Sequence, residues 1–386
     1  MKSCDWAEMC YFRTMAKEWL ETWQELGARL AEARKTARLS QADLAAAVQL
    51  DRTAITKVEA GERKLDALEL SRLSEVLKRP IEWFLTPSPP AVLSRRKGRD
   101  FEGDSQADVL LETLAGDVNL LVELKALTPP QSPRPRRIDS IVSAEAAARE
   151  LRQNLGLETG PIWDLQAIAE QVGLYAFSLD LQEESLHGSY LRLERGAVAV
   201  VNGQAQSGRR RFTLLHELGH HIYSDDVSSE WIIGTDGDDR ERLIDAFVIH
   251  FLMPREAVLS RWPALIEQGD ERQAAISLGV QFGVSWTAVV AHLCNLGFID
   301  DGTRARFEAD RPRKADYLEG GMILREELAP PAIPPRFAQA VLRAYKGHKV
   351  SGERALQLLR DTITAAELPP EDQVPVESML SQFELD

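Results

Sequence analysis

Apolar residues recur three and four positions apart in the N-terminal part of the chain, in short runs that are separated by turn-forming residues. This period places the apolar side chains on one face of an α-helix. The runs predict five short helices, with Ser40 capping the second, Asp51 capping the third, Gly61 ending the third and Pro80 starting the fifth. We therefore expect an all-α domain at residues 25–86.

Residues 138–300 combine helical and strand patterns. The alanine-rich residues 144–155 and the run at 162–172 have the helical period. Three short apolar stretches predict strands, at residues 174–177, 188–193 and 196–202. A longer helical pattern follows. This domain is therefore expected to be α+β with a small sheet, within a chain that is mostly helical.

Proline-rich stretches divide the chain. Residues 87–137 are expected to form a linker that carries one helix at 109–127, because the prolines at both ends favour an extended, unpacked chain. The basic cluster at 95–99 either binds phosphate or is simply solvated. Residues 301–386 are expected to be a helical C-terminal region for dimerisation or substrate docking, with a further proline hinge inside it at residues 330–335. Residues 1–24 form an N-terminal extension to which the pattern assigns no role.

Composition limits the classes of partner. The net charge of −14 argues against non-specific coating of nucleic acid by the whole protein, but it does not forbid a local basic face. No run of about 18 uncharged apolar residues could span a membrane, and the N-terminus lacks the apolar core of a signal peptide. Cys4, Cys10 and Cys294 are far from any metal-ligand spacing and fit a reducing compartment. We expect a cytoplasmic protein without a membrane partner.

The third helix of the N-terminal domain carries candidate DNA-contacting residues. If Ile55 and Val58 are buried, the outer face of this helix presents polar side chains that can reach base edges in a major groove. The candidates are Arg52, Thr53, Thr56 and Lys57, together with Gln41, which begins the preceding helix and is placed for a phosphate. A merely solvated helix face would carry similar residues, so the order of the helices has to decide between the two interpretations.

The runs at residues 39–45 and 55–63 supply that order. They read Leu-Ser-Gln-Ala-Asp-Leu-Ala and Ile-Thr-Lys-Val-Glu-Ala-Gly-Glu-Arg, and with the surrounding helices they closely resemble the XRE (Cro/C1-type) helix-turn-helix family. The resemblance implies a double-stranded DNA operator as a partner, which we expect the chain to bind as a homodimer. It does not reveal the operator sequence, because threonine and lysine contacts are not a one-to-one code.

A metal site is predicted by two histidines and three acidic residues. His216 and His220 lie four positions apart on a predicted helix, so both imidazoles can bind one metal ion while Glu217 reaches a metal-bound water as the catalytic base. A catalytic zinc needs a third protein ligand. Glu241, on a second predicted helix, supplies it, and Asp245 on the same face can accept a hydrogen bond from a ligand imidazole. The sequence predicts a His-His-Glu site for one Zn²⁺ per chain.

Four blocks around these residues look like the ImmA/IrrE family of metallopeptidases. They lie at residues 163–170, 211–220, 241–254 and 284–297. The resemblance implies a zincin-like (gluzincin) fold, zinc, and site-specific cleavage of a repressor-type protein in a regulatory role. The sequence departs from the family at His250, where a small or acidic residue is more usual, and this changes the local electrostatics.

The group that stabilises the oxyanion is left open. Tyr190, Tyr223, His187 and His250 are candidates, although each is also explained by a structural or solvent-facing role. His221 follows the motif directly, points to another face of the helix and is expected to be a bystander.

Two functional hypotheses follow. In the first, a DNA-binding transcriptional regulator is fused to a zinc metalloendopeptidase that cleaves a repressor or antitoxin-type regulator, or its own linker, in a stress, phage-related or toxin–antitoxin response. In the second, the chain is a non-catalytic XRE-type regulator or antitoxin whose zinc domain is a sensor or docking module. Glu217 discriminates between them, because its replacement by glutamine should abolish cleavage while zinc and DNA binding persist.

Overall fold

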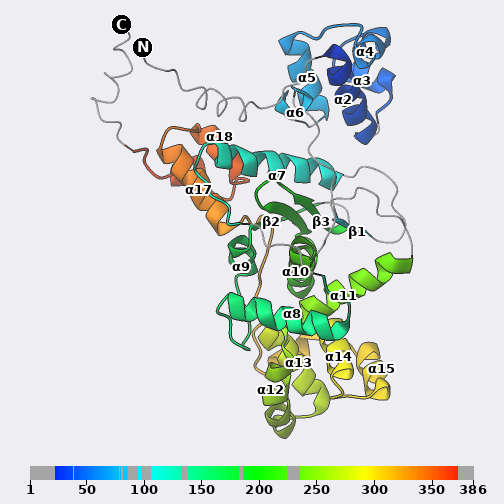
Figure 1. The fold of residues 1–386 in the computed structure, drawn as a ribbon, viewed down its shortest axis with the longest axis vertical. Coiled ribbons are helices and arrows are strands. Elements are labelled where there is room, and N and C mark those ends of the chain that lie inside the picture. The colour runs from blue at the N-terminus through cyan, green and yellow to red at the C-terminus, as the bar shows by residue number, and fades with distance from the viewer. Residues whose placement is uncertain are drawn as a thin grey trace, which may run out of the picture. The chain divides into compact units, whose positions relative to one another are not determined.

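The computed structural model describes residues 22–37, 39–77, 79, 81–85, 94–97, 106–131, 137–181, 186–223 and 235–372 (Figure 1). The described chain is mostly helical with one small sheet, as predicted. It divides into two compact units, Met1–Ala91 with Glu102–Thr113 and Val92–Phe101 with Leu114–Asp386. The domain boundaries expected from the sequence stay predictions. Most of the N-terminal extension, with Cys4 and Cys10, lies outside the described residues.

The first unit is built from short helices. They are α2 (Trp23–Thr36), α3 (Gln41–Ala47), α4 (Arg52–Glu59), α5 (Ala67–Leu77) and α6 (Ile81–Leu85). Ser40 caps α3 as predicted, since its side chain accepts a hydrogen bond from the backbone N–H of Asp43. Asp51 stands at the N-cap of α4 but makes no side-chain capping bond. Gly61 adopts a left-handed φ of 73° just after α4, as expected for a helix-ending glycine.

The second unit contains one mixed sheet. Its strands are β1 (Ser94–Lys97), β2 (Leu174–Leu179), β3 (Leu186–Arg192) and β4 (Ala197–Asn202), in the order β1-β3-β4-β2. β2 and β4 are parallel, whereas β3 is antiparallel to both of its neighbours. The three predicted strands are confirmed. Residues 94–97, inside the stretch expected to be a linker, form a strand through backbone pairing with β3 although they lack apolar alternation. The two interpretations of the basic cluster at 95–99, phosphate binding and solvation, stay predictions.

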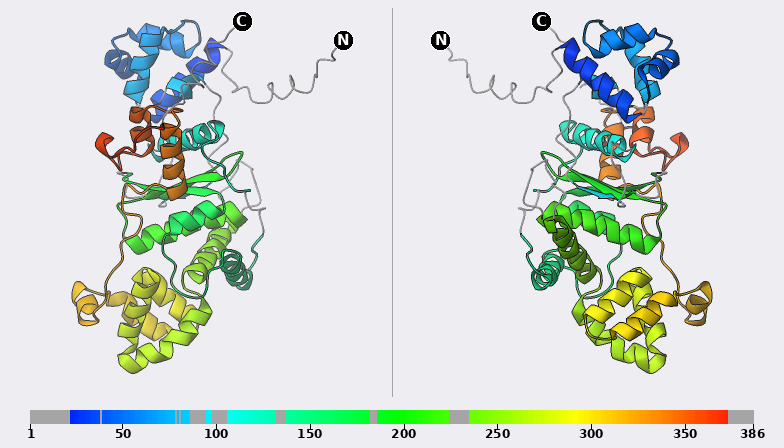
Figure 2. Two further views of the ribbon diagram at one scale, coloured as in Figure 1. Left: turned by 90° about the vertical axis from the view of Figure 1, so that its left-hand side faces the viewer. Right: turned by 90° about the vertical axis from the view of Figure 1, so that its right-hand side faces the viewer.

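The remaining described elements are helices, some of which pack on the sheet. They are α7 (Gln106–Glu123), α8 (Ile141–Asn154), α9 (Leu165–Gln171), α10 (Ser207–Tyr223), α11 (Thr235–Leu252), α12 (Arg255–Gln268), α13 (Glu271–Phe282), α14 (Trp286–Asn295), α15 (Asp301–Ala309), α16 (Lys314–Glu319), α17 (Pro335–Lys346), α18 (Gly352–Leu358) and a short 3₁₀ turn at Ala365–Glu367. The side views show α10 running along one face of the sheet (Figure 2). The predicted helix at 109–127 is α7. A glycine at position 116 favours an interruption of this helix, but α7 runs through Gly116 without a break.

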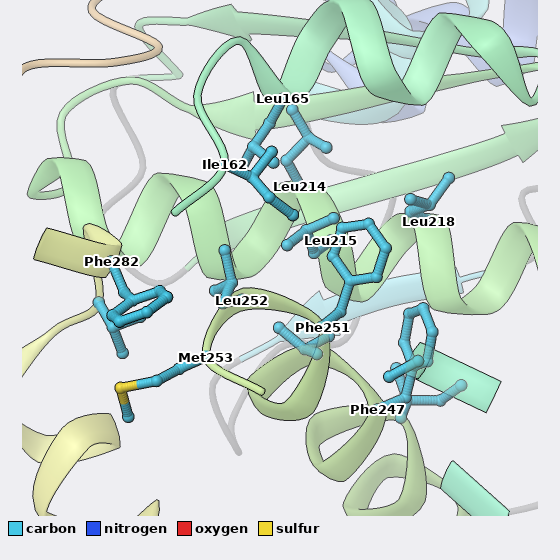
Figure 3. Packing of buried hydrophobic residues seen from close by; sticks show 14 of the residues in the cluster. Ile162, Leu165, Leu214, Leu215, Leu218, Phe247, Phe251, Leu252, Met253 and Phe282 are labelled. Carbon is cyan, nitrogen blue, oxygen red and sulfur yellow. The ribbon is translucent and has the colours of Figure 1, made fainter. Parts of the chain in front are cut away.

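Part of the core of the second unit lies between α10 and α11. Leu215 on α10 lies beside the ring of Phe251 on α11, while Leu214 lies beside Ile162 and Leu165 (Figure 3). Leu214, Leu215, Leu218, Phe247 and Phe251 are all fully buried. Apolar residues three and four apart on both helices produce this contact, and burying such side chains contributes about 1.5–3 kcal/mol each. The interface therefore fixes the distance between the two helices that carry the candidate metal ligands.

A buried arginine ties the start of α10 to distant segments. Arg211 is 0% exposed, and its guanidinium donates to the backbone carbonyls of Ile162 at 2.7 Å and Gly283 at 3.1 Å. It also pairs with the carboxylate of Glu327. Burial lowers the pKa of Arg211 to about 10, which still leaves it charged at neutral pH.

The C-terminal region is helical, as predicted, and packs on the same unit. The buried carboxylate of Glu170 accepts hydrogen bonds from the backbone N–H groups of Arg336 and Phe337, at 2.9 and 3.0 Å, and so caps α17 from α9. Asp117 on α7 pairs with Arg354 on α18 and with Arg360, which follows α18 in the chain. These contacts make the region an integral part of the unit.

Within the described ranges, no single helix is both long and apolar enough to cross a membrane. The bent pair α13 and α14 reaches the required length and composition only together, with an angle of 113° between the helices.

Candidate metal centre and nucleic-acid interface

Three predicted ligands meet between α10 and α11. His216 and His220, one turn apart on α10, direct their Nε2 atoms toward each other at 3.0 Å. Glu241 on α11 places its carboxylate oxygens 2.9 Å from His216 Nε2 and 3.4 Å from His220 Nε2. The three ligand atoms all lie within 4.8 Å of one another. Both imidazoles are buried, while the Glu241 side chain is 43% exposed, so the cluster is open on one side.

Asp245 fixes the orientation of one imidazole. Its Oδ1 lies 2.8 Å from His216 Nδ1, so the neutral ring donates from Nδ1 and turns the lone pair of Nε2 toward His220 and Glu241. Burial raises the pKa of Glu241, but when the two imidazoles are protonated their hydrogen bonds and positive charge outweigh burial and hold that pKa below its usual value. Glu241 is therefore an anion at neutral pH.

The donor set fits a metal ion. Two unprotonated Nε2 atoms at 3.0 Å repel each other unless a proton or a cation lies between them. Two imidazole nitrogens and one carboxylate are ligands that zinc takes in catalytic sites. The structure therefore contains a possible His-His-Glu metal site, formed by His216, His220 and Glu241.

Two glycines, which the sequence analysis did not single out, allow the backbone to approach the site closely. A Cβ on Gly188 of β3 would lie 2.5 Å from Thr213 Cγ2 and 2.8 Å from Glu217 Oε1. A Cβ on Gly219 would lie 2.8 Å from Cγ2 of Ile244 on α11. Only glycine leaves room at such approaches. The glycine inside the predicted strand at 188–193 was the available signal for the first of them.

Glu217 is completely buried on α10. Gly188 places the backbone of β3 directly over its carboxylate. β3 therefore borders the predicted catalytic base.

Tyr190 and His221 form a buried pair. The Tyr190 hydroxyl lies 2.9 Å from His221 Nδ1, and His221 Nε2 lies 2.9 Å from the carbonyl oxygen of Val172. Burial raises the pKa of Tyr190 to about 12 and lowers the pKa of His221 to about 4, so both stay neutral. This pair links β3, α10 and the end of α9, and His221 is a structural residue in this geometry.

The other oxyanion candidates contact groups outside the ligand cluster. The Tyr223 hydroxyl donates to a backbone carbonyl of α8 at 3.3 Å. His187 Nε2 lies 2.7 Å from an arginine of α10. His250 is buried, with Nε2 3.8 Å from a carboxylate oxygen of Glu145, and burial lowers its pKa. The structure brings the two histidines and Glu241 together. Glu217 follows His216 directly on α10, its catalytic role stays a prediction, and the oxyanion group is not assigned.

In the first unit, α4 presents the predicted polar face. Ile55 and Val58 are buried against the other helices. The four outward residues, Arg52, Thr53, Thr56 and Lys57, are all exposed. This is the arrangement that a groove-reading helix requires.

Gln41 has a local partner. Its Nε2 donates to Glu59 Oε2 at 2.8 Å, and Glu59 is also paired with Arg34 at 2.6 Å. Gln41 therefore joins the start of α3 to the end of α4. The predicted phosphate contact by this side chain stays a prediction.

Comparison with protein families locates both sites inside matching regions. A helix-turn-helix family model matches residues 30–84, which include α4. The model of the IrrE N-terminal-like domain, a peptidase family, matches residues 169–293, which include all three possible metal ligands and Glu217. The comparison with curated proteins gave no match. The chain thus joins a helix-turn-helix domain of the XRE type to a domain of the IrrE N-terminal-like peptidase family.

Proposed function

We propose that this chain is a zinc-dependent metalloendopeptidase fused to a DNA-binding regulator. Its substrate in this proposal is a repressor or antitoxin-type regulator, cleaved at one site in a stress, phage-related or toxin–antitoxin response. The single observation that carries the proposal is the convergence of His216, His220 and Glu241 beside the buried Glu217. We place this activity in the cytoplasm, where such DNA-bound regulators act.

The proposal assigns each residue a role. His216, His220 and Glu241 would hold zinc, which when bound supplies Lewis acidity and makes water easier to deprotonate. Glu217 takes the proton from the attacking water and delivers it to the leaving nitrogen. Asp245 keeps His216 in the tautomer that leaves Nε2 unprotonated. The backbone of β3 over Glu217 shields the carboxylate from bulk water.

In this proposal the helix-turn-helix unit determines which DNA the chain binds. We propose that α4 lies in the major groove of an operator, that Arg52, Thr53, Thr56 and Lys57 contact it, and that the chain binds as a homodimer. The support is the exposure of all four side chains on a helix whose opposite face is buried. Such a domain would concentrate the peptidase near regulators bound to the same DNA.

The experiment compares wild type with Glu217→Gln. Zinc-loaded protein is incubated with the regulators encoded beside its gene, and the products are separated and sequenced. We expect one specific cut by wild type and none by the variant, with zinc content and DNA affinity unchanged. Cleavage by the glutamine variant at the wild-type rate would refute the enzymatic role.

Zinc content gives an independent test. Freshly purified protein should hold about one equivalent, because three protein ligands bind zinc tightly. Less than about half an equivalent would contradict the metal site. Full zinc and operator binding without cleavage of any regulator would instead favour a sensor or docking domain.

A further inference from the structure

The sheet edge beside Glu217 is occupied by the chain itself. β1, Ser94–Lys97, pairs antiparallel with β3, with Ser94 opposite Tyr190, Arg95 opposite Ser189 and Arg96 opposite Gly188. β3 pairs with β4 on its other side. The segment that sequence analysis placed in a linker therefore fills the position next to β3 that an added strand would take.

The register brings β1 close to the proposed catalytic base. The position of a Cβ on Gly188 is 2.8 Å from Glu217 Oε1, so the Gly188 Cα lies within about 4.5 Å of that oxygen, since a Cα–Cβ bond is about 1.5 Å long. Opposite residues of an antiparallel pair have Cα atoms about 4.5–5.5 Å apart. The backbone of Arg96 is thus at most about 10 Å from the Glu217 carboxylate.

Backbone pairing is a general means of holding a peptide. An extended peptide that joins a sheet edge gains affinity from main-chain hydrogen bonds, which do not depend on its sequence. The sequence Ser-Arg-Arg-Lys has no apolar alternation and is only four residues long. A strand of four residues can make only a few main-chain hydrogen bonds, so a longer peptide that pairs over more of β3 can replace it.

We propose that Ser94–Lys97 occupies the edge of β3 that a substrate peptide uses, and that it must leave before another protein can bind there. This inference rests on the peptidase function proposed above. The segment then acts as an internal competitor. A substrate of this site is an extended stretch of protein that pairs antiparallel with β3.

The first test measures amide hydrogen exchange in Arg95→Pro/Arg96→Pro. Successive residues of a strand direct their N–H groups to opposite sides, so one of the two prolines removes a donor that faces β3. The matched control, Arg95→Ala/Arg96→Ala, removes the same two charges but keeps both donors. A chain with residues 94–97 replaced by glycine and serine provides a second way to weaken the pairing.

In the proline variant we expect about tenfold or faster exchange at every second amide of Gly188–Tyr190, because these amides lose their partner strand. The intervening amides face β4 and should keep their protection. In the alanine control, all amides of β3 should exchange at the wild-type rate. Unchanged exchange across β3 in both the proline and the glycine–serine variants would overturn the proposal.

The second test adds a peptide. A labelled peptide of residues 92–99 is titrated into zinc-loaded Glu217→Gln, with and without the two prolines, so that the peptide is not consumed. We expect at least about tenfold tighter binding when the internal strand is weakened, because the edge is then open. Equal affinity for both proteins would contradict the inference.

The two proposals fail in different ways. If the chain is no peptidase, cleavage is absent but the exchange pattern still changes in the proline variant. If the internal strand does not occupy the edge, cleavage persists while exchange and peptide affinity stay the same in both proteins.

Discussion

Replacing Gly188 by alanine should lower both the stability of the peptidase domain and its activity. The added Cβ would stand 2.5 Å from Thr213 Cγ2, 2.8 Å from Glu217 Oε1 and 3.2 Å from the carbonyl oxygen of Val200. Ordinary contacts of this kind begin near 3.4 Å. At least one of these three groups must therefore move. The Thr213 and Glu217 side chains can shift more easily than the backbone carbonyl of Val200.

The size of the effect follows from those contacts. Forcing one extra carbon into a packed interior costs about 1–3 kcal/mol in the free energy of unfolding. The Glu217 carboxylate has to withdraw by roughly half an ångström to reach an ordinary contact distance. A misplacement of about 1 Å in a reacting group can cost about a hundredfold in rate. We therefore expect cleavage to fall by about ten- to a hundredfold.

Thr213→Ser tests the explanation, because it removes the methyl group that the new Cβ would touch first. In Gly188→Ala/Thr213→Ser the unfolding free energy should recover, while cleavage stays low because the contact with Glu217 remains. Gly160→Ala is the matched control, since nothing lies within 4 Å of its added Cβ. Denaturant unfolding measures stability, and cutting of the identified regulator measures activity. Wild-type stability and cleavage in Gly188→Ala would refute the reasoning.

Three further predictions address the ligand cluster, the C-terminal region and the DNA-binding helix. Asp245→Ala should weaken zinc binding by about 10- to 100-fold, measured by competition with a chelator, because His216 loses the acceptor that orients it; equal affinity would contradict that role. Burial raises the pKa of Glu170 from 4.5 to about 7. Between pH 4.5 and 7 the folded protein therefore binds more protons than the unfolded chain. The free energy of unfolding should fall as the pH rises through this range, by up to about 3 kcal/mol. Denaturant midpoints from pH 4 to 8 should show this slope in wild type and not in Glu170→Gln, and a slope shared by both proteins would disprove the assignment. Lys57→Ala should lower affinity for operator DNA and reduce the salt dependence of binding by about one unit of slope, whereas an unchanged slope would remove this residue from the interface.

Local patterns predicted the helices and the contents of the ligand cluster. The four-residue spacing of His216 and His220 places both rings on one face of a helix whatever surrounds it. The spacing of Glu241 and Asp245 does the same on α11, and the structure brings the two faces together. These features depend on residues within one turn, so the sequence was sufficient.

Long-range contacts were not predictable in the same way. β1 is a strand only because β3 lies beside it, and its four polar residues have no strand pattern of their own. A run of three arginines gave no sign that Arg211 is completely buried, since its partners come from segments before and after it in the chain. Gly188 looked like an ordinary strand glycine, and its importance comes from the side chains of α10 beneath it.

The geometry of the ligand cluster depends on how α11 is held at residues other than Glu241 itself. At the C-terminal end of the helix, Arg152 donates to the carbonyl oxygen of Phe251 at 2.6 Å. At its middle, Ile244 packs where Gly219 lacks a side chain, so α10 and α11 approach closely. A helix fixed at these two points carries Glu241 as part of a rigid element, and rigid elements position ligands more precisely than loops do. The position of the third ligand is therefore set by core packing, and the motif on α10 acquires its partner through a contact that the motif itself does not contain.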